Sequence, residues 1–493
     1  MPQISYGRAL SLHAEREPER PALVCDGRTH TRGELDRASN RLARDFEARG
    51  VGAGDFVAIG LPNGPAFLLA AFAAWKLGAV PQPISARLPA PERRAILERA
   101  RPALIVGAEP GSSGETPCLP EGFVPDPRVS DSALPDRTAP HRQALASGGS
   151  TGTPKLIVDA LPALCDPSEP FYGNQPGTPV LTPGPLYHAG PFINSVVTLL
   201  GGGLLVLMSR FDPEQALALI ERHRVEWVNF VPTMMHRIWR LPEATRARYD
   251  LSSLRVVMSS GAAIPDWLFR AWIDWLGPDR VQQAYGGTER IGGTHITGRE
   301  WLLRPGSVGR PTGGRKLRVQ DADGVELPPG EIGEVFMLPP GGRGSTYRYV
   351  GAEPRASADG WETLGDMGYL DADGFLFLVD RRTDMVVTGG ENVYPAEVEG
   401  AIDAHPAVLS SAVIGLPDDD LGQRLHAIVQ SAAPLAAAEL VRHLEPRLVR
   451  YKIPRSFEFT REALRDDAGK VRRQALREAR LAKAPTPTTE ETR

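Results

Sequence analysis

A glycine-rich segment at residues 147–155, Ser-Gly-Gly-Ser-Thr-Gly-Thr-Pro-Lys, combines residue types that bind phosphate. Glycines let backbone N–H groups approach phosphate oxygens, hydroxyl groups donate further hydrogen bonds, and a lysine adds a point charge. The segment is not a Walker-type loop, because Pro154 precedes Lys155 and the Gly-Lys-Ser/Thr ending is missing. On this interpretation the phosphate-binding residues are Ser147, Gly148, Gly149, Ser150, Thr151, Gly152 and Lys155.

Two other interpretations fit the same segment. Gly148, Ser150 and Gly152 match the nucleophile elbow of α/β-hydrolases, in which Ser150 would attack the substrate. That elbow needs a helix directly after the serine, and Thr153-Pro154 disfavours it, because the residue before a proline is kept out of the α region. A plain surface turn is the third interpretation. On this segment alone all three stay open, since such short patterns recur by chance.

Helix and strand signals alternate over residues 1–300. Thr31 and Glu34 form a capping box before an apolar series at helical spacing. Residues 56–60, 225–230 and 254–258 predict strands, and Pro213 predicts the first turn of a helix. Strands separated by helices imply parallel sheets covered on both faces, and ligands bind at the carboxyl ends of such strands.

The pattern changes from about Arg304 to short strands and glycine-rich turns. The tetrapeptide Asp-Ala-Asp-Gly occurs at 321–324 and 371–374, where it predicts hairpin turns; neither copy has the glutamate that a calcium loop places at its twelfth position. From about Asp384 the chain resembles a separate α+β unit, with helices near 395–404 and 435–450 and strands at 409–415 and 425–431.

Composition narrows the class of protein. The chain has 493 residues, which predicts two or more domains, and hydrophobic and charged residues make up 42% and 24%, as in a globular protein. Lysine and arginine total 56 against 60 acidic residues, so no broad basic face for nucleic acid is indicated. The apolar runs at 66–75 and 193–208 are too short or too interrupted to span a membrane and predict buried core. Scattered cysteines at 25, 118 and 165, and an N-terminus without an apolar signal, favour the cytoplasm.

Six motifs follow one another along the chain. They are the segment 147–155, Pro185-Leu186-Tyr187-His188, Tyr285-Gly286-Gly287-Thr288-Glu289, Gly365-Asp366 with Asp380-Arg381, the stretch 389–399, and Gly469-Lys470. In order and spacing this set resembles the superfamily of adenylate-forming enzymes, which includes acyl-CoA synthetases, the adenylation domains of peptide synthetases and firefly luciferase. The resemblance covers about residues 5 to 475 and favours the phosphate-loop interpretation.

The resemblance implies an α/β fold in two domains. Residues 1–380 would form a large N-terminal domain of parallel-rich sheets covered by helices, with a distorted β-barrel region. Residues 381–384 would be a hinge, 385–481 a small mobile α+β domain, and 482–493 a disordered tail. Relatives usually carry Asp or Lys at the position of Thr383 in this hinge. Two further departures, Gly148 and Leu156, also occur in a subgroup that includes bile-acid–CoA ligases.

The resemblance also implies roles in binding ATP with Mg²⁺. Lys155 and the loop hydroxyls would hold the leaving β- and γ-phosphates, Thr288 would hydrogen-bond the α-phosphate, and Glu289 would ligate Mg²⁺. The nucleoside would be bound by Tyr285 and Gly286, by the backbone of Gly261 and Ala262, and by Asp366 and Arg381 at the ribose. Taken singly, each of these residues also fits a turn, a strand end or a solvated charge.

The acid and its acceptor would use other residues. The resemblance places His188 at the mouth of an acid pocket lined by Tyr187, Trp227, Asn229, Met234 and Gly286, although periodicity alone predicts core positions for the strand and helix members of this set. Lys470 would reach in from the C-terminal domain and bridge the acid and the α-phosphate. After a domain rotation, Gly389, Gly390 and Glu391 would line a tunnel for CoA, the expected acceptor.

Several functions compete at this point. The leading hypothesis is an AMP-forming acid–CoA ligase; alternatives within the superfamily transfer the acyl group to an amine or a carrier protein, or adenylate nitrite. The alternative from another class is a serine hydrolase that uses Ser150. A catalytically inactive binding protein is disfavoured, because the chain retains Thr288, Glu289, Asp366, Arg381 and Lys470 together. Neither the acid nor the oligomeric state follows from the sequence.

Overall fold

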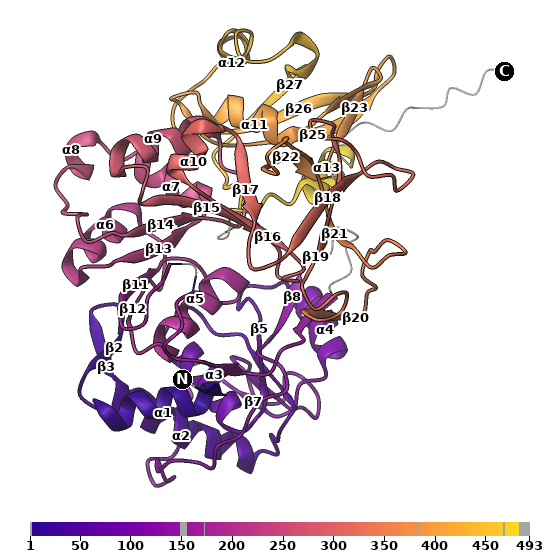
Figure 1. Ribbon diagram of the computed structural model, residues 1–493. Helices are drawn as coiled ribbons and strands as arrows, with labels where there is room; N and C mark the ends of the chain where they lie inside the picture. Colours follow the sequence, from indigo (N-terminus) through magenta and orange to yellow (C-terminus); the bar gives the residue numbers. More distant parts are fainter. Residues whose placement is uncertain (1, 148–154, 172, 382–383, 467–468, 483–493) are drawn as a thin grey trace.

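A mixed sheet forms the middle of the molecule (Figure 1). The computed structural model describes residues 2–147, 155–171, 173–381, 384–466 and 469–482. Neighbouring strands run parallel in the order β2-β12-β11-β13-β14-β15. Their bounds are β2 Pro21–Cys25, β11 Pro179–Thr182, β12 Leu204–Leu207, β13 Trp227–Phe230, β14 Val256–Ser259 and β15 Val281–Gly286. The predicted parallel sheet is therefore confirmed, although β13 and β14 begin two residues later than the sequence pattern indicates.

Beyond β15 the same sheet continues with antiparallel strands. These are β16 Gly293–Thr297, β17 Ser307–Pro311, β22 Leu376–Arg381, β21 Glu362–Leu370, β19 Gly333–Leu338 and β18 Lys316–Gln320, while β3 Arg28–Thr31 closes the other edge. Both Asp-Ala-Asp-Gly segments form turns, because the amide of Asp321 donates to Val325 O and that of Asp371 to Phe375 O. The turn prediction is thus confirmed.

Two smaller sheets lie beside the N-terminal helices. A parallel sheet holds β5 Val80–Pro83, β4 Phe56–Ile59, β6 Leu104–Val106 and β7 Cys118–Leu119, and an antiparallel one holds β8 Ala144–Ser147, β9 Lys155–Asp159 and β20 Tyr347–Val350. The short strands β1 Ile4–Ser5 and β10 Leu164–Cys165 pair with each other. Because β8 and β9 pair, the glycine-rich segment connects the two arms of a hairpin.

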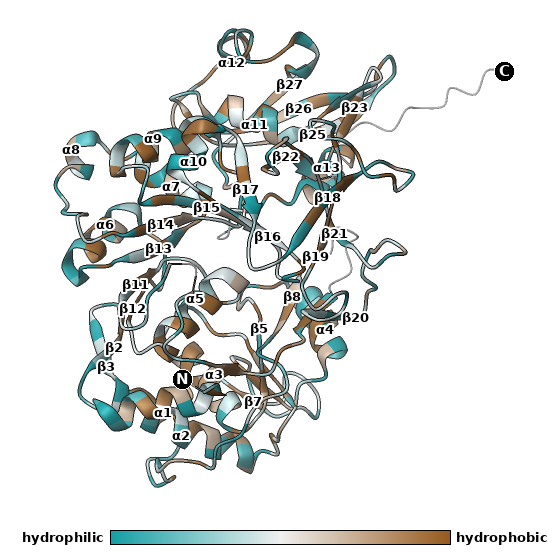
Figure 2. Cartoon of the chain, viewed as in Figure 1, coloured by the Kyte–Doolittle hydropathy of each residue, from teal (hydrophilic) through white to brown (hydrophobic). Residues whose placement is uncertain are grey.

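Helices cover these sheets on both faces. They are α1 Tyr6–Arg16, α2 Arg32–Ala48, α3 Pro65–Lys76, α4 Ala90–Ala100, α5 Ala189–Leu200, α6 Pro213–His223, α7 Pro232–Trp239, α8 Glu243–Arg246, α9 Asp266–Leu276 and α10 Gly298–Leu303. The predicted capping box at Thr31 and Glu34 begins α2, and Asp212 caps α6. Figure 2 shows α3 as largely apolar, and Phe67, Phe72 and Trp75 of this helix are fully buried, as predicted. Within the described ranges, no helix is both long and apolar enough to traverse a membrane.

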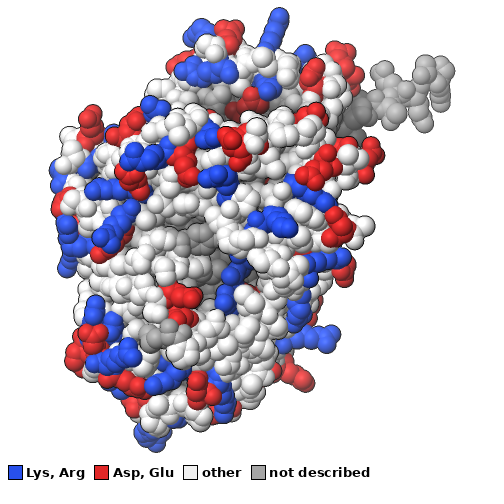
Figure 3. Space-filling model, in the orientation of Figure 1, with Lys and Arg blue, Asp and Glu red and all other residues white. Residues whose placement is uncertain are grey.

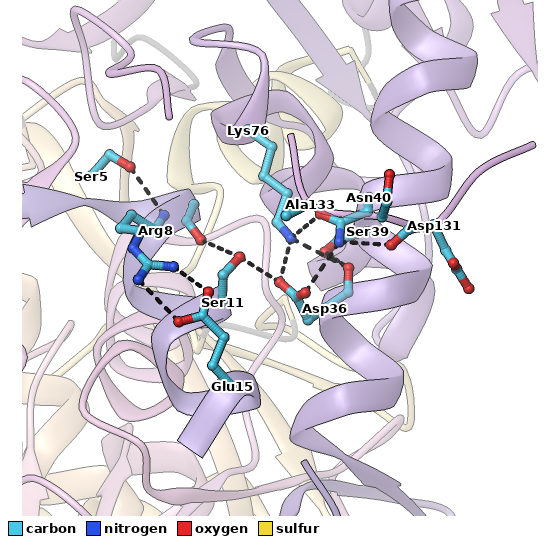
Figure 4. Close-up of polar contacts among 12 residues, drawn as sticks. Ser5, Arg8, Ser11, Glu15, Asp36, Ser39, Asn40, Lys76, Asp131 and Ala133 are labelled. Atoms are coloured by element: carbon cyan, nitrogen blue, oxygen red, sulfur yellow. Dashed lines mark hydrogen bonds and ion pairs between the residues drawn. The ribbon is translucent and has the colours of Figure 1, made fainter. Parts of the chain in front are cut away.

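One buried ammonium ties the N-terminal helices together (Figure 4). Lys76 Nζ, at the end of α3, donates to Asp36 Oδ1 over 2.6 Å and also to Asn40 Oδ1, both on α2. Ser11 Oγ of α1 donates to the same Asp36 oxygen over 2.6 Å. Desolvation lowers the pKa of Lys76, while the Asp36 carboxylate opposes that shift. A buried charge is tolerated here because its donors are satisfied.

The C-terminal portion has its own apolar core. Its elements are β23 Val386–Thr388, β24 Glu391–Val393, α11 Pro395–Asp403, β25 Val408–Asp418, β26 Gly422–Ser431, α12 Ala437–Leu444, β27 Ser456–Thr460 and α13 Arg473–Leu481. Val398, Val413 and Leu440 pack together in its interior. The predicted α+β character is confirmed, but the helix predicted to run from 435 to 450 ends at Leu444. The hinge at 381–384 stays a prediction, and Thr383 lies outside the described residues.

Candidate active site

The carboxyl ends of β13, β14 and β15 face the start of α5 (Figure 1). Asn229, near the end of β13, donates from Nδ2 to Ser260 Oγ, just after β14, over 2.8 Å. In the first turn of α5, a Cβ placed on Gly190 would lie 3.6 Å from the same amide nitrogen. Because parallel strands end at one edge, residues far apart in the sequence meet here, as the strand pattern predicts.

An anchored carboxylate lies beside a lysine in this region. Glu289, which follows β15, is 8% exposed, and its Oε1 accepts a 2.6 Å hydrogen bond from the Tyr349 hydroxyl. Lys155 Nζ, at the start of β9, lies 3.7 Å from Glu289 Oε1 and 3.8 Å from the centre of the Tyr349 ring. Burial, followed by the charge of Glu289, raises the pKa of Tyr349, so its hydroxyl stays protonated and can donate.

Tyr349 is a site residue that sequence reasoning missed. It lies on β20, opposite Ile157 of β9, and only this pairing carries its ring over Lys155. The alternation of Tyr347 and Tyr349 predicts a strand, but no sequence motif relates that strand to a segment almost 200 residues earlier. The contact could be found only once the strand pairing was known.

Two residues predicted to contact the nucleoside are hydrogen-bonded to each other. The Tyr285 hydroxyl donates to Asp366 Oδ2 over 2.6 Å. Asp366 lies on β21, where its register partner on β22 is Arg381. Gly261, with φ of 86°, and Ala262 follow β14 at the same edge of the sheet. The structure therefore brings the predicted nucleoside residues to one edge.

His188 is the N-cap residue of α5, and its ring lies 4.4 Å from that of Tyr187. Its Nε2 is shielded from solvent and has no hydrogen-bond partner among the described residues. Burial, followed by the charge of Lys470, lowers the pKa of His188 to about 4. The imidazole is consequently neutral at pH 7, with a nitrogen available to a ligand.

Lys470, which belongs to the C-terminal portion, lies in the region of His188. Arg465 donates from one guanidinium nitrogen to Gly469 O over 3.2 Å, and the Lys470 amide donates to Asp466 Oδ1 over 2.9 Å, so the turn is held from both sides. Gly469 has φ of 76°, and a Cβ on it would lie 2.8 Å from Thr233 Oγ1 in the first turn of α7. Both the backbone angle and the close approach require glycine here.

Further contacts join the two portions of the chain. Arg240, which follows α7, donates to His405 O over 3.1 Å and to Pro406 O. Arg472 forms a 3.5 Å ion pair with Glu92 of α4. Together with the packing of Gly469 against Thr233, these contacts hold the segment of Lys470 in the part of the molecule where its charge acts on His188.

Some of the predicted site residues lie away from this site, and others fall outside the residues that the structure describes. The turn with Gly389, Gly390 and Glu391 joins β23 to β24 and contacts Leu421 of its own portion. Trp227 packs in an apolar cluster with Val180, and Met234 lies in the main core, so both occupy the core positions that periodicity predicts. Gly286 and Thr288 follow Tyr285 at the sheet edge. Gly148, Gly149, Ser150, Thr151 and Gly152 lie outside the described residues, and Ser147 is described only as the last residue of β8.

Three sets of polar side chains meet near the ends of the parallel strands. They are a lysine–glutamate–tyrosine cluster, a tyrosine–aspartate pair and a lysine from the C-terminal portion. Together they define an enzyme that binds a nucleotide beside an acid. Two family models match the chain: the AMP-binding enzyme model matches residues 10–342, and the AMP-binding enzyme C-terminal domain model matches residues 397–470. The chain belongs to the AMP-binding enzyme family, within the adenylate-forming superfamily.

Characterised relatives span almost the whole chain. A feruloyl-CoA synthase from an Amycolatopsis species is 34% identical and covers 94% of this chain and 96% of its own length. The fatty acid–[acyl-carrier-protein] ligase ScoC from Streptomyces coeruleorubidus is 32% identical, covering 96% and 95%. The o-succinylbenzoate CoA synthetase from Bacillus subtilis, solved with its acyl-adenylate intermediate, has a TM-score of 0.81 at 27% identity, covering 97% and 98%. A structure of the same synthetase with ATP and a magnesium ion has a TM-score of 0.79 at 27% identity, covering 96% and 99%.

Proposed function

We propose that this enzyme activates a small-molecule acid with ATP and then transfers the acyl group to CoA. The observation that carries the proposal is that Gly469 packs against Thr233 of α7 and brings the charge of Lys470 to His188, in the part of the molecule that also holds Glu289. Nucleotide-binding groups and an acid-binding group are thus within reach of one reacting centre. We place the reaction in the cytoplasm, as the scattered cysteines predict.

In the first half-reaction a carboxylate oxygen of the acid attacks the α-phosphorus of ATP. A new oxygen–phosphorus bond forms while the bond to the bridging oxygen breaks, and pyrophosphate leaves with that electron pair. Such a transfer needs charge neutralisation and in-line positioning more than covalent help. Lys155, with Ser147, Ser150 and Thr151 of the loop, would hold the leaving phosphates. Thr288 would hydrogen-bond the α-phosphate.

The nucleoside would be fixed by the pair of Tyr285 and Asp366. Their 2.6 Å hydrogen bond orients the carboxylate, which would accept a hydrogen bond from a ribose hydroxyl. The ring of Tyr285 would stack on adenine, with Gly286, Gly261 and Ala262 along the same slot. Arg381, paired with Asp366 in the strand register, would contact the ribose from the other side.

Lys470 and His188 would act on the acid. The ammonium of Lys470 would bridge the carboxylate and the α-phosphate, where negative charge gathers as the two anions approach each other. A neutral His188 imidazole can hydrogen-bond the acid without adding a competing cation. Tyr187, Trp227, Asn229 and Met234 are proposed to shape the pocket around them.

Glu289 fits a site for Mg²⁺. Its carboxylate is a hard oxygen donor, and Tyr349 and Lys155 fix its position. Among the described residues, His, Cys, Asp and Glu side chains form no metal-binding group of three or more. One carboxylate together with substrate phosphates is a common way for proteins to bind Mg²⁺. When bound, the ion would neutralise phosphate charge as pyrophosphate leaves.

The second half-reaction needs the C-terminal portion to turn. The thiol sulfur of CoA would attack the acyl carbon, and AMP would leave as the carbon–oxygen bond breaks. Rotation about residues 381–384, including Thr383, would withdraw Lys470 and bring Gly389, Gly390 and Glu391 to the site. The contacts of Arg240 with His405 and Pro406 would break in that step.

The test is acid-dependent release of pyrophosphate and AMP, measured with and without CoA across an acid panel. We expect pyrophosphate to depend on the acid and AMP release to rise with CoA. AMP release that ignores CoA would overturn the transfer step and favour a carrier protein or an amine as acceptor. Ester cleavage without ATP, abolished by Ser150→Ala, would instead support the serine hydrolase.

A further inference from the structure

A cavity of about 180 Å³ runs beside α5. Phe192, Ile193, Val196, Val197 and Leu200 line one side, and their spacing places them along one stripe of the helix. Figure 3 shows a hollow in the visible face, in the region that α5 occupies in Figure 1, with acidic side chains at its edge. An apolar cavity of about 150 Å³ is large enough to bind benzene, so this one can accept a group of ring size.

Unpaired polar groups lie in the far wall of this cavity. Tyr6, at the start of α1, is 7% exposed, and Gln143, just before β8, is 5% exposed. Both line the cavity, and neither side chain has a hydrogen-bond partner among the described residues. Burial raises the pKa of Tyr6 to about 12, so the hydroxyl stays protonated and can donate. Both groups therefore face the cavity with donors that a group bound there can use.

The charged residues that line the cavity favour the binding of an uncharged group. Arg142 lines the same wall and donates from Nε to Pro162 O over 3.3 Å. Asp159 is neutralised by a 2.8 Å ion pair with Arg290, whereas Glu169 adds negative charge to the lining. The Tyr6 hydroxyl and the Gln143 amide can both donate, which suits an uncharged oxygen acceptor better than a second carboxylate.

Two elements connect the cavity lining to the proposed reacting centre, namely α5 and the segment that holds Arg290. Helix α5 starts directly after His188, and at 1.5 Å per residue Ile193 lies about 7 Å and Leu200 about 18 Å further along its axis. Arg290, another lining residue, follows Glu289 directly in the chain. An acid held by its carboxylate at His188 could therefore extend along α5 into the cavity.

We propose, on the basis of the proposed function, that the cavity beside α5 holds the far end of the acid substrate. The substrate class is an elongated carboxylic acid with an apolar body and a ring-sized distal group that bears a hydroxyl or carbonyl oxygen. Tyr6 and Gln143 donate to that oxygen, and Val197 contacts the apolar body. None of these residues belongs to the pocket predicted around Trp227 and Asn229.

The experiment measures acid-dependent pyrophosphate release with three probes: butanoate, 6-phenylhexanoate and 6-(4-hydroxyphenyl)hexanoate. For the wild type we expect kcat/KM to be about five- to tenfold higher with the hydroxyphenyl acid than with the phenyl acid, the worth of one hydrogen bond. Tyr6→Phe and Gln143→Leu should each lower that preference, and the double variant, which lacks both donors, should reduce it to below about twofold. If the preference for the hydroxyphenyl acid is the same in Tyr6→Phe, Gln143→Leu and the wild type, the proposed role of Tyr6 and Gln143 is overturned.

A second variant tests the cavity itself. Val197→Trp places an indole in the space, so the ratio of kcat/KM for 6-phenylhexanoate over butanoate should drop about tenfold or more. The matched control, Val124→Trp, changes a surface valine that is 78% exposed and should leave both acids unaffected. An unchanged ratio in Val197→Trp, or a wild type that uses butanoate but neither ring acid, would overturn the inference while leaving acid activation intact.

Failure of the proposed function has a different signature. It would appear as no acid-dependent pyrophosphate release from the wild type with any acid. If Val197→Trp melts well below the wild type, the ratios in Tyr6→Phe and Gln143→Leu decide the outcome, because these near-isosteric changes keep the packing.

Discussion

The nucleotide side and the acid side of the site differ in how their polar groups are paired. On the nucleotide side Glu289 is held by Tyr349, and Asp366 by Tyr285. On the acid side, by contrast, His188 Nε2 and the Tyr6 hydroxyl have no hydrogen-bond partner among the described residues. On the proposed assignment, the first side is preorganised for the nucleotide, whereas the second leaves hydrogen bonds open for the acid.

The largest expected effect comes from removing the lysine between the two sides. Lys470→Ala should lower acid-dependent ATP–pyrophosphate exchange by about 10²- to 10³-fold, because a preorganised charge at the reacting centre is lost. Thioester formation from a supplied acyl-adenylate should be spared. Lys316→Ala, which changes an exposed lysine on β18, is the control. Equal loss of both half-reactions would contradict the assignment of Lys470 to the first half alone.

A smaller loss is expected on the nucleotide side. Glu289→Gln removes the anionic oxygen while keeping the shape, so kcat/KM for ATP should fall about 10²-fold and half-maximal activity should need more Mg²⁺. Titration of the rate with Mg²⁺ measures both effects. The control is Glu331→Gln, in an exposed turn. An unaltered Mg²⁺ requirement would remove Glu289 from the proposed metal site.

The acid side should be the more sensitive to pH. Because the pKa of His188 is lowered from 6.5 to about 4, the unfolded state binds more protons between these values, and stability falls as the pH drops from about 6.5 to 4. His236, also lowered to about 4 by burial, adds to the same slope. Denaturation midpoints across this pH range should fall less steeply in His188→Asn. An identical slope would show that His188 is protonated in the folded protein.

The smallest effect tests how the two portions are held together. Arg240→Ala removes hydrogen bonds to His405 O and Pro406 O, each worth about 1 kcal/mol, and should weaken adenylation by no more than about thirtyfold. The ratio of thioester formation to adenylation should rise, because these two hydrogen bonds stabilise only the arrangement with Lys470 in the site. Arg270→Ala, on the exposed face of α9, is a control. A lower ratio would contradict this assignment.

The two sides also differ in what the sequence could predict. Glu289, Tyr285 and Asp366 belong to motifs with fixed spacing, so a shared task for them could be predicted from the sequence. Tyr349 could not be, because strand pairing alone brings β20 to β9. The cavity groups were also missed, since Tyr6 and Gln143 are more than 100 residues apart and converge only when α1, β8 and α5 pack together.

The packing of Gly469 against Thr233 bears on two properties of the proposed rotation, namely the final position of Lys470 and the rate of the movement. In the proposed rotation, the contact of Gly469 with the first turn of α7 would set the final position of Lys470, which the connection at 381–384 would not determine. In that proposal, a different residue in the connection, such as Thr383 where relatives usually carry Asp or Lys, would change the rate of rotation without changing the final position of Lys470.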